Sequence, residues 1–240
     1  MKNIFKPVIQ KSKITMLFIW LFLLLFQHIQ SQNIVNDLKK INLKYLQTKR
    51  YELILNYQLF LDNQFDSKTS AEFMKDGSSY YYKIEDNELI KNKSMLVSVD
   101  HTDKIVVIRK NVKEEINKNS LMKIDFEEIV KNYEKVTRIV NGKNVQYQID
   151  FKNSKYKSVI LKYDSTTMFL TYIKIIFRVP VEVDEKTRKM AFIEINISTN
   201  LNNLVFKADQ FSYTKFITVS GKTFKLNSPY SAYQLFVSEE

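Results

Sequence analysis

The chain has 240 residues, of which 13% are aromatic, no cysteine, and a formal net charge of +11. Without cysteine it has no disulfide, no thiolate metal ligand and no lipobox cysteine for a lipid anchor, so hydrophobic burial has to hold the fold together. Its three glycines, Gly77, Gly142 and Gly221, lie too far apart to build a phosphate-cradling loop, which excludes a P-loop or Rossmann nucleotide site.

Residues 1–31 have the layout of a secretory signal peptide. Four lysines precede an apolar block from Ile14 to Phe26, and a polar stretch ending at Ser31 follows it. The block has 13 residues, whereas crossing the hydrocarbon core takes about 20. An uncleaved anchor extending to Ile29 is the alternative. We expect cleavage near Ser31, a mature chain that begins at Gln32, and a periplasmic or secreted location.

An amphipathic helix is predicted next, from Asn33 to about Lys49, because apolar residues recur there at helical spacing. They are Ile34, Leu38, Ile41, Tyr45 and Leu46. From Tyr51 to Leu61 the period changes to two, which places alternate apolar side chains on one face of a strand. We expect the helix to pack on the sheet that contains this strand.

An antiparallel meander should follow, because short β-type runs alternate with turn-forming residues such as Asp76-Gly77. We place its strands at Ser70–Lys75, Ser79–Glu85, Glu88–Lys91, Met95–Asp100, Lys104–Lys110, Lys135–Val140, Lys143–Phe151, Tyr156–Tyr163, Met168–Val179, Lys189–Ser198, Phe211–Val219 and Tyr233–Val237. A second, short helix is predicted from Asp125 to Tyr133, where Asp125 can cap the free backbone amides.

These elements predict a mainly β fold of the α+β class, with a curved antiparallel sheet or half-open barrel of about 11–12 strands. The first helix precedes all the strands instead of alternating with them, which excludes a doubly wound α/β fold. No linker rich in Pro, Gly or Ser divides the chain, so residues 32–240 are expected to form a single domain.

Catalytic motifs are scarce. Outside the predicted signal peptide the only histidine is His101, between Asp100 and Asp103. A pair of His and Asp could activate a serine, but no glycine lies in a G-x-S-x-G context. One histidine with two carboxylates also cannot close a zinc shell. We therefore predict a turn histidine, no catalytic residue, no metal site and no cofactor.

Nucleic-acid binding is also not predicted, although the chain is basic and rich in aromatic residues. The candidate stacking platform is Tyr80-Tyr81-Tyr82. On a strand, Tyr80 and Tyr82 face one way and Tyr81 the other, so the three rings cannot serve one ligand. Lysine is interspersed with acidic residues along the chain, which favours a solvated surface over a polybasic arm.

The order of elements nevertheless suggests a family. An aromatic strand within Ser78–Ile84, a strand ending in Asp100, and a Lys-apolar strand within Lys104–Val107 follow one another. This pattern of strands covers residues 78–109. Together with the predicted export signal, the helix and the long strand, it resembles the outer-membrane lipoprotein carriers, the LolA/LolB-like superfamily, over about residues 32–151. The resemblance implies a half-open barrel whose mouth is closed by helices and whose apolar concavity holds acyl chains.

Three features depart from that family pattern. Arg50 opens the first long strand but does not match the motif of the family's lid-locking arginine. The absence of cysteine argues against the membrane-bound acceptor branch, whose members are lipoproteins. The region after Phe151 cannot be matched position by position.

The resulting prediction is an exported, soluble, monomeric carrier, not an enzyme, which binds lipid or lipoprotein acyl chains and has an outer- or inner-membrane protein as a further partner. The expected ligand-binding residues are Tyr57, Leu59, Phe73, Tyr82, Val97, Tyr147 and Ile149. Two alternatives stay open at this point. Side chains could fill the barrel completely, and the chain could instead be a non-catalytic periplasmic or cell-surface assembly module that pairs through an edge strand.

Overall fold

The computed structural model describes residues 34–93, 95–110, 132–202, 204–207, 209–221 and 223–239. The predicted signal peptide lies outside these residues, as does most of the predicted helix from Asp125 to Tyr133. Its last residue, Tyr133, begins a strand.

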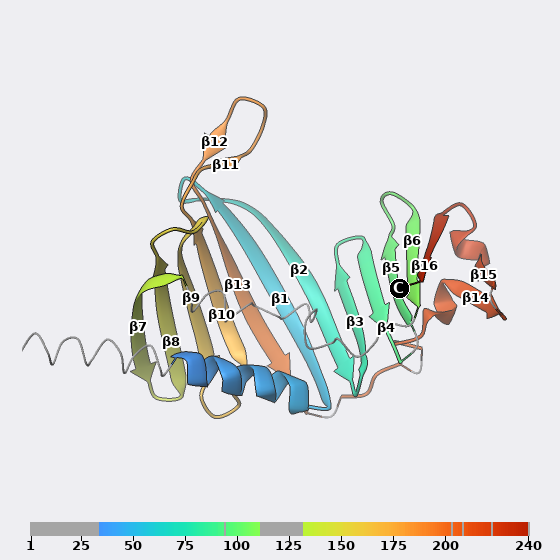
Figure 1. Ribbon diagram of the computed structural model, residues 1–240, viewed down its shortest axis with the longest axis horizontal. Helices are drawn as coiled ribbons and strands as arrows, with labels where there is room; N and C mark the ends of the chain where they lie inside the picture. The colour runs from blue at the N-terminus through green and yellow to red at the C-terminus, as the bar shows by residue number, and fades with distance from the viewer. Residues whose placement is uncertain are drawn as a thin grey trace, which may run out of the picture.

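A single curved sheet of twelve strands dominates the described part of the chain, in the order β16-β6-β5-β4-β3-β2-β1-β13-β10-β9-β8-β7 (Figure 1). The strands are β1 (Arg50–Leu61), β2 (Gln64–Asp76), β3 (Ser79–Ile84), β4 (Asn87–Lys91), β5 (Met95–Asp100), β6 (Ile105–Lys110), β7 (Tyr133–Asn141), β8 (Asn144–Phe151), β9 (Tyr156–Asp164), β10 (Leu170–Phe177), β13 (Ala191–Asn200) and β16 (Gln234–Glu239). The predicted mainly β fold with a curved sheet is confirmed. Two pairs depart from the meander, because β1 pairs with the distant strand β13 and β16 joins β6 in parallel.

Two short hairpins and two 3-10 turns lie outside this sheet. The strands β11 (Val181–Glu182) and β12 (Arg188–Lys189) form a hairpin between β10 and β13, and β14 (Ile217–Ser220) pairs with β15 (Thr223–Leu226). Two 3-10 turns, η1 (Tyr213–Lys215) and η2 (Ser228–Tyr230), lie near the C-terminus. The predicted strand Phe211–Val219 is therefore wrong over its first half, because the Ser212 side chain accepts a hydrogen bond from the Thr214 amide and starts η1.

The first hairpin is longer than predicted. Asp62 and Asn63 both have positive φ, at 50° and 66°, which gives a tight two-residue turn between β1 and β2. Strand β2 therefore begins at Gln64 instead of Ser70. Its first five residues are exposed, and this stretch lacks the alternation of apolar and polar residues that reveals a half-buried strand.

The N-terminal helix, residues 34–47, lies across one face of the sheet near the end where β1 begins (Figure 1). Ile34, Leu38, Ile41 and Tyr45 of the predicted stripe are buried against β1, β2, β7–β10 and β13, and together they form the first core. Leu46, which the stripe also included, is 37% exposed. The packing of the helix on the sheet is confirmed.

A second core lies on the opposite face of β3–β6. The three tyrosines of β3 show the division, because Tyr80 and Tyr82 pack against the first core whereas Tyr81 belongs to the second. The C-terminal segment, residues 213–239, covers the second core with Phe216 and Ile217, both fully buried. Both faces of this half of the sheet therefore carry apolar side chains.

Candidate functional site: an apolar shelf beside the helix

Half-buried apolar side chains continue the first core beyond the helix. We call Tyr57, Leu59, Tyr82, Ile175 and Ile193 the shelf. Leu59 lies opposite Ile193 in the pairing of β1 with β13, and Ile193 lies opposite Ile175 in the pairing of β13 with β10. Because paired residues point to the same face of a sheet, these three form one contiguous apolar row.

The shelf is apolar surface that the helix does not cover. On the same face of β1, Leu53 and Leu55 are buried beneath the helix, whereas Tyr57 and Leu59 nearer the far end of the strand are only half-buried. Ile175 and Ile193 are half-buried in the same way on the neighbouring strands. Side chains thus fill this face under the helix, and a half-exposed apolar surface extends beyond it.

Two phenols give the shelf a polar element. The phenols of Tyr57, on β1, and Tyr82, on β3, lie close enough to influence each other's ionisation. Burial raises the pKa of Tyr82 to about 12, and the nearby Tyr57 phenol raises it further. Both phenols stay neutral and able to donate hydrogen bonds at physiological pH.

The predicted ligand-binding residues fall into three groups. Tyr57, Leu59 and Tyr82 lie on the shelf. Phe73, Tyr147 and Ile149 lie on the same face but are buried in the first core, with Tyr147 and Ile149 fully inaccessible. Val97 points to the opposite face and belongs to the second core, so it does not line one surface with the other six residues. Alternation within β5 places Met95, Val97 and Val99 together on the face of the second core, and Leu96, Ser98 and Asp100 on the other face.

A polar network that the sequence analysis missed ties the helix to the sheet. The Asp37 carboxylate accepts hydrogen bonds from the hydroxyls of Tyr147, at 2.7 Å, and Tyr163, at 2.6 Å. Arg138 adds a hydrogen bond to the Tyr147 hydroxyl at 3.0 Å and lies 3.7 Å from the same carboxylate. Burial, with the Asp37 carboxylate adding to it, raises the pKa of Tyr163 to about 12. At the other end of the helix the Lys75 ammonium donates to the Tyr45 carbonyl at 2.9 Å, and the Tyr45 hydroxyl accepts a hydrogen bond from the Leu170 amide at 3.2 Å.

His101 belongs to a second polar cluster, away from the shelf. Its two ring nitrogens lie 3.0 Å from Glu88 Oε1 and 3.0 Å from the Tyr233 hydroxyl, so its partners are not the neighbouring aspartates. Lys215 also contacts the Glu88 carboxylate. Burial acts to raise the pKa of Glu88, but the hydrogen bonds from Lys215 and His101 outweigh it and hold that pKa below its ordinary value. This cluster fastens the C-terminal segment to β4 and β5.

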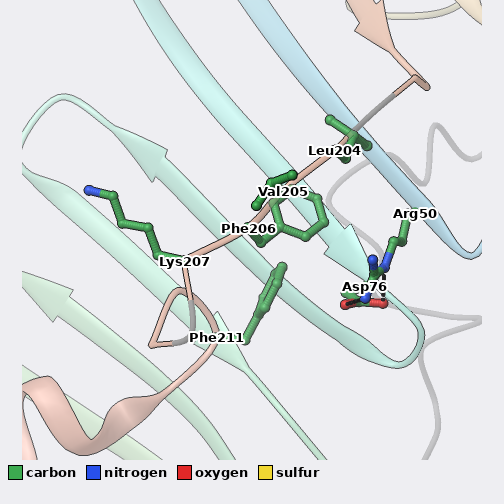
Figure 2. A pocket seen from close by; sticks show the side chains of 7 residues that line it. All are labelled: Arg50, Asp76, Leu204, Val205, Phe206, Lys207 and Phe211. Carbon is green, nitrogen blue, oxygen red and sulfur yellow. Dashed lines mark hydrogen bonds and ion pairs between the residues drawn. The ribbon is translucent and has the colours of Figure 1, made fainter.

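A small cavity lies where the linker after β13 passes the ends of β1 and β2 (Figure 2). It has a volume of about 340 Å³ and is lined by Arg50, Asp76, Leu204, Val205, Phe206, Lys207 and Phe211. Arg50 makes two hydrogen bonds to Asp76, at 2.9 and 2.7 Å, so this arginine joins the two strands. Phe206 and Phe211 pack edge to face.

The described part of the chain offers neither a metal site nor a membrane-spanning helix. Among the residues that the structure describes, no group of three or more His, Asp or Glu side chains is placed to hold a metal ion. Within the same residues, no helix has the length and apolar character needed to span a bilayer.

No protein-family model matches this sequence, and a search of curated proteins finds no match. The structure is similar to several solved structures at low identity. A chain of the MucA/MucB complex of Pseudomonas aeruginosa matches with a TM-score of 0.40 and 9% identity, over 76% of this chain and 60% of that one.

Two further solved structures also match at low similarity. An outer membrane lipoprotein-sorting protein domain from Vibrio parahaemolyticus has a TM-score of 0.33 and 7% identity, over 77% of this chain and 98% of that one. A LolA superfamily protein from Nitrosomonas europaea has a TM-score of 0.30 and 7% identity, over 70% and 94%. The structure thus has matches, at low sequence identity, among LolA-superfamily, MucB and lipoprotein-sorting folds.

Proposed function

We propose that this chain is an exported, non-catalytic carrier that binds the acyl chain of a lipid or lipoprotein on the shelf, and that it acts in the periplasm or outside the cell. The observation that carries the proposal is the contiguous row of Leu59, Ile193 and Ile175, which continues the buried core as half-buried apolar surface. A folded domain ordinarily covers such surface with its own side chains or with a ligand.

An acyl chain suits the shelf chemically. Each methylene that leaves water contributes about 0.8 kcal/mol, so a chain laid along the row gains affinity in proportion to its length. The neutral phenols of Tyr57 and Tyr82 belong to the same shelf and can donate a hydrogen bond to a carboxyl or ester oxygen at the end of that chain. The expected binding is hydrophobic and tolerant of acyl-chain structure.

Titration with a fluorescent fatty acid, 11-(dansylamino)undecanoic acid, tests this proposal. Leu59→Glu places a carboxylate at the β1 end of the row and should weaken probe binding about tenfold or more, because burying an unpaired charge is costly. Asn56→Glu adds the same charge to an exposed position on the other face of β1 and should leave the affinity unchanged. Equal affinities for the two variants, or no probe binding by the unmodified protein, would contradict the carrier function.

The assembly module is the second candidate, and one observation favours it. Strand β7 forms one edge of the sheet in the described part of the chain, and its Ile139 and Val140 are both more than half exposed. An exposed apolar edge can accept a strand from a partner. Replacing Ile139 and Val140 with lysine should abolish such an assembly while leaving fatty-acid binding intact.

A further inference from the structure

The C-terminal segment, residues 213–239, has many contacts of its own. Strands β14 and β15 form a hairpin whose ends are joined by Asn227, because its amide donates to the Phe216 carbonyl at 2.9 Å and its side chain donates to the Thr214 carbonyl at 2.6 Å. The Thr218 hydroxyl donates to the Asn227 side chain at 2.7 Å. The rings of Phe216 and Tyr230 pack edge to face. The segment is therefore a small unit with internal hydrogen bonds and ring contacts.

This unit packs on the second core and on the edge of β6. Phe216 and Ile217 are fully buried among the apolar side chains of β3–β6. Strand β16 extends the sheet by pairing in parallel with β6, from Gln234 opposite Ile105 to Glu239 opposite Lys110. The apolar side chains and the strand edge thus hold the unit together.

Three polar contacts fix the position of the unit. Lys215 contacts the Glu88 carboxylate, and the Tyr233 hydroxyl lies 3.0 Å from a ring nitrogen of His101. The Gln234 amide donates to the Lys104 carbonyl at 2.8 Å. The partners of these contacts lie on β4 or in the β5–β6 turn, so one continuous surface of β3–β6 receives the unit.

Residues 201–212 form the linker between β13 and this unit. The described residues of the linker belong to no strand, and Val205 is 93% exposed. Their hydrogen bonds are local, such as those from the Asn202 amide to the Asn200 side chain and from the Gln210 amide to the Lys207 carbonyl. The cavity of about 340 Å³ lies between the linker and the ends of β1 and β2 (Figure 2). The linker is thus only loosely attached to the strands that it passes.

The length of the linker matches its span with some excess. From β13 to β6 the sheet order gives six steps between neighbouring strands. At about 4.8 Å a step this is about 29 Å, whereas the linker residues, fully extended, reach about 40 Å. A linker of this length can place the unit on its own sheet or, turned outward, on the sheet of an adjacent molecule.

We propose that the second core and the β6 edge of one molecule bind the C-terminal segment of a second copy of this chain, which gives a dimer with exchanged segments. Each contact described above is made again in that dimer, because both copies supply the same surface and the same segment. The dimer and two monomers then differ mainly in the path of the linker and in the entropy of association. High protein concentration therefore favours the dimer, and the monomer expected from the sequence is one of two states.

Exchange also gives the linker a partner. Val205 and Phe206 are residue types that favour strands, and Val205 points into solvent. Around the two-fold axis of an exchanged dimer the two linkers run antiparallel to each other. Pairing of the two Leu204–Phe206 stretches would supply backbone hydrogen bonds and cover Val205.

Disulfide trapping tests the proposal, since the chain has no cysteine of its own. Val107 on β6 lies opposite Phe236 on β16. Neighbouring strands are about 4.8 Å apart, a separation that a disulfide can bridge. Unlabelled Val107→Cys and isotopically labelled Phe236→Cys are refolded together at high concentration and oxidised only afterwards. Peptide mapping should then find a disulfide between positions 107 and 236 that joins a labelled chain to an unlabelled one.

Two controls set the scale of this result. Val205→Cys, at the 93% exposed linker position, replaces Phe236→Cys and measures chance collisions with Val107→Cys. The yield between positions 107 and 236 should exceed this background about fivefold or more, because strand pairing raises the effective concentration of the two thiols. The double variant Val107→Cys and Phe236→Cys, refolded at low concentration, should close the same disulfide within one chain.

Light scattering of the unmodified protein gives an independent measurement. It should show a species of two chains whose fraction rises with protein concentration. A yield between positions 107 and 236 no higher than the Val205→Cys background would overturn the proposal, even if dimers form by another surface. A single-chain mass at every concentration would overturn it as well. So would failure of the double variant to close its disulfide, because β16 would then not lie beside β6.

Discussion

The hydroxyl of Tyr147 donates a 2.7 Å hydrogen bond to the carboxylate of Asp37, which joins the N-terminal helix to strand β8 across 110 positions of sequence. The same carboxylate accepts from Tyr163, so one side chain of the helix satisfies two phenols of the sheet. The network therefore fastens the helix to the part of the sheet whose side chains form the first core.

Asp37→Ala should destabilise the protein by about 2–3 kcal/mol, because it leaves two partly buried hydroxyls without their acceptor. Denaturant unfolding followed by circular dichroism measures this change. Asn36→Ala, at an exposed neighbouring position of the same helix, should change stability by less than about 0.5 kcal/mol. Equal effects of the two substitutions would mean that the network contributes nothing specific.

Acid should loosen the C-terminal segment. The folded pKa of Glu88 lies below its ordinary value of 4.5, so its ion pair with Lys215 and its contact with His101 stabilise the fold fully above pH 4.5. That stabilisation is lost as the pH falls through the folded pKa, because the protonated carboxyl no longer attracts the lysine. The protection of the β16 amides from hydrogen exchange, relative to the intrinsic exchange rate at each pH, should therefore fall below pH 4.5.

A variant isolates the contribution of Glu88 from that of other carboxylates. Glu88→Gln should exchange its β16 amides faster than the unmodified protein at neutral pH, and the difference should shrink in acid. Glu134→Gln, at an exposed position on β7, serves as the control for removing one carboxylate. An acid response of the β16 amides that is identical in both variants would rule out Glu88 as its source.

We predict that the signal peptide is cleaved during export. Protein recovered from the exporting cell should begin at Gln32 and be soluble without detergent, because the apolar block from Ile14 to Phe26 is short for a membrane span. Intact-mass analysis measures the processed length. A mass that includes residues 1–31, together with detergent-dependent solubility, would favour the uncleaved anchor.

The sheet could be predicted well wherever one face is buried and the other is solvated. Strand β8 is the clearest example, because Val145, Tyr147, Ile149 and Phe151 alternate with polar residues and all four are buried. The exposed first half of β2 carries no such alternation and was missed. The parallel pairing of β16 with β6 was also missed, because nothing local indicates which edge a terminal strand will join.

The candidate site could be predicted only in part, for a related reason. Alternation along β1 placed Tyr57 and Leu59 on the apolar face correctly, but it could not show where along that face the helix stops. Tyr147 and Ile149 are consequently covered, and Val97 packs in a second core that alternation cannot distinguish from the first. The partners of His101 and Asp37 come from distant segments, which spacing in the sequence does not reveal.

Photolabelling with a fatty acid that carries a diazirine at the end of its chain tests the carrier account most directly, because it locates the bound acyl chain. The account predicts that labelled peptides contain Tyr57 and Leu59 of β1 or Ile193 of β13, and that unlabelled fatty acid suppresses the labelling. Labelling confined to the second core, around Val97 and Phe216, or labelling that competitor does not suppress, would contradict it.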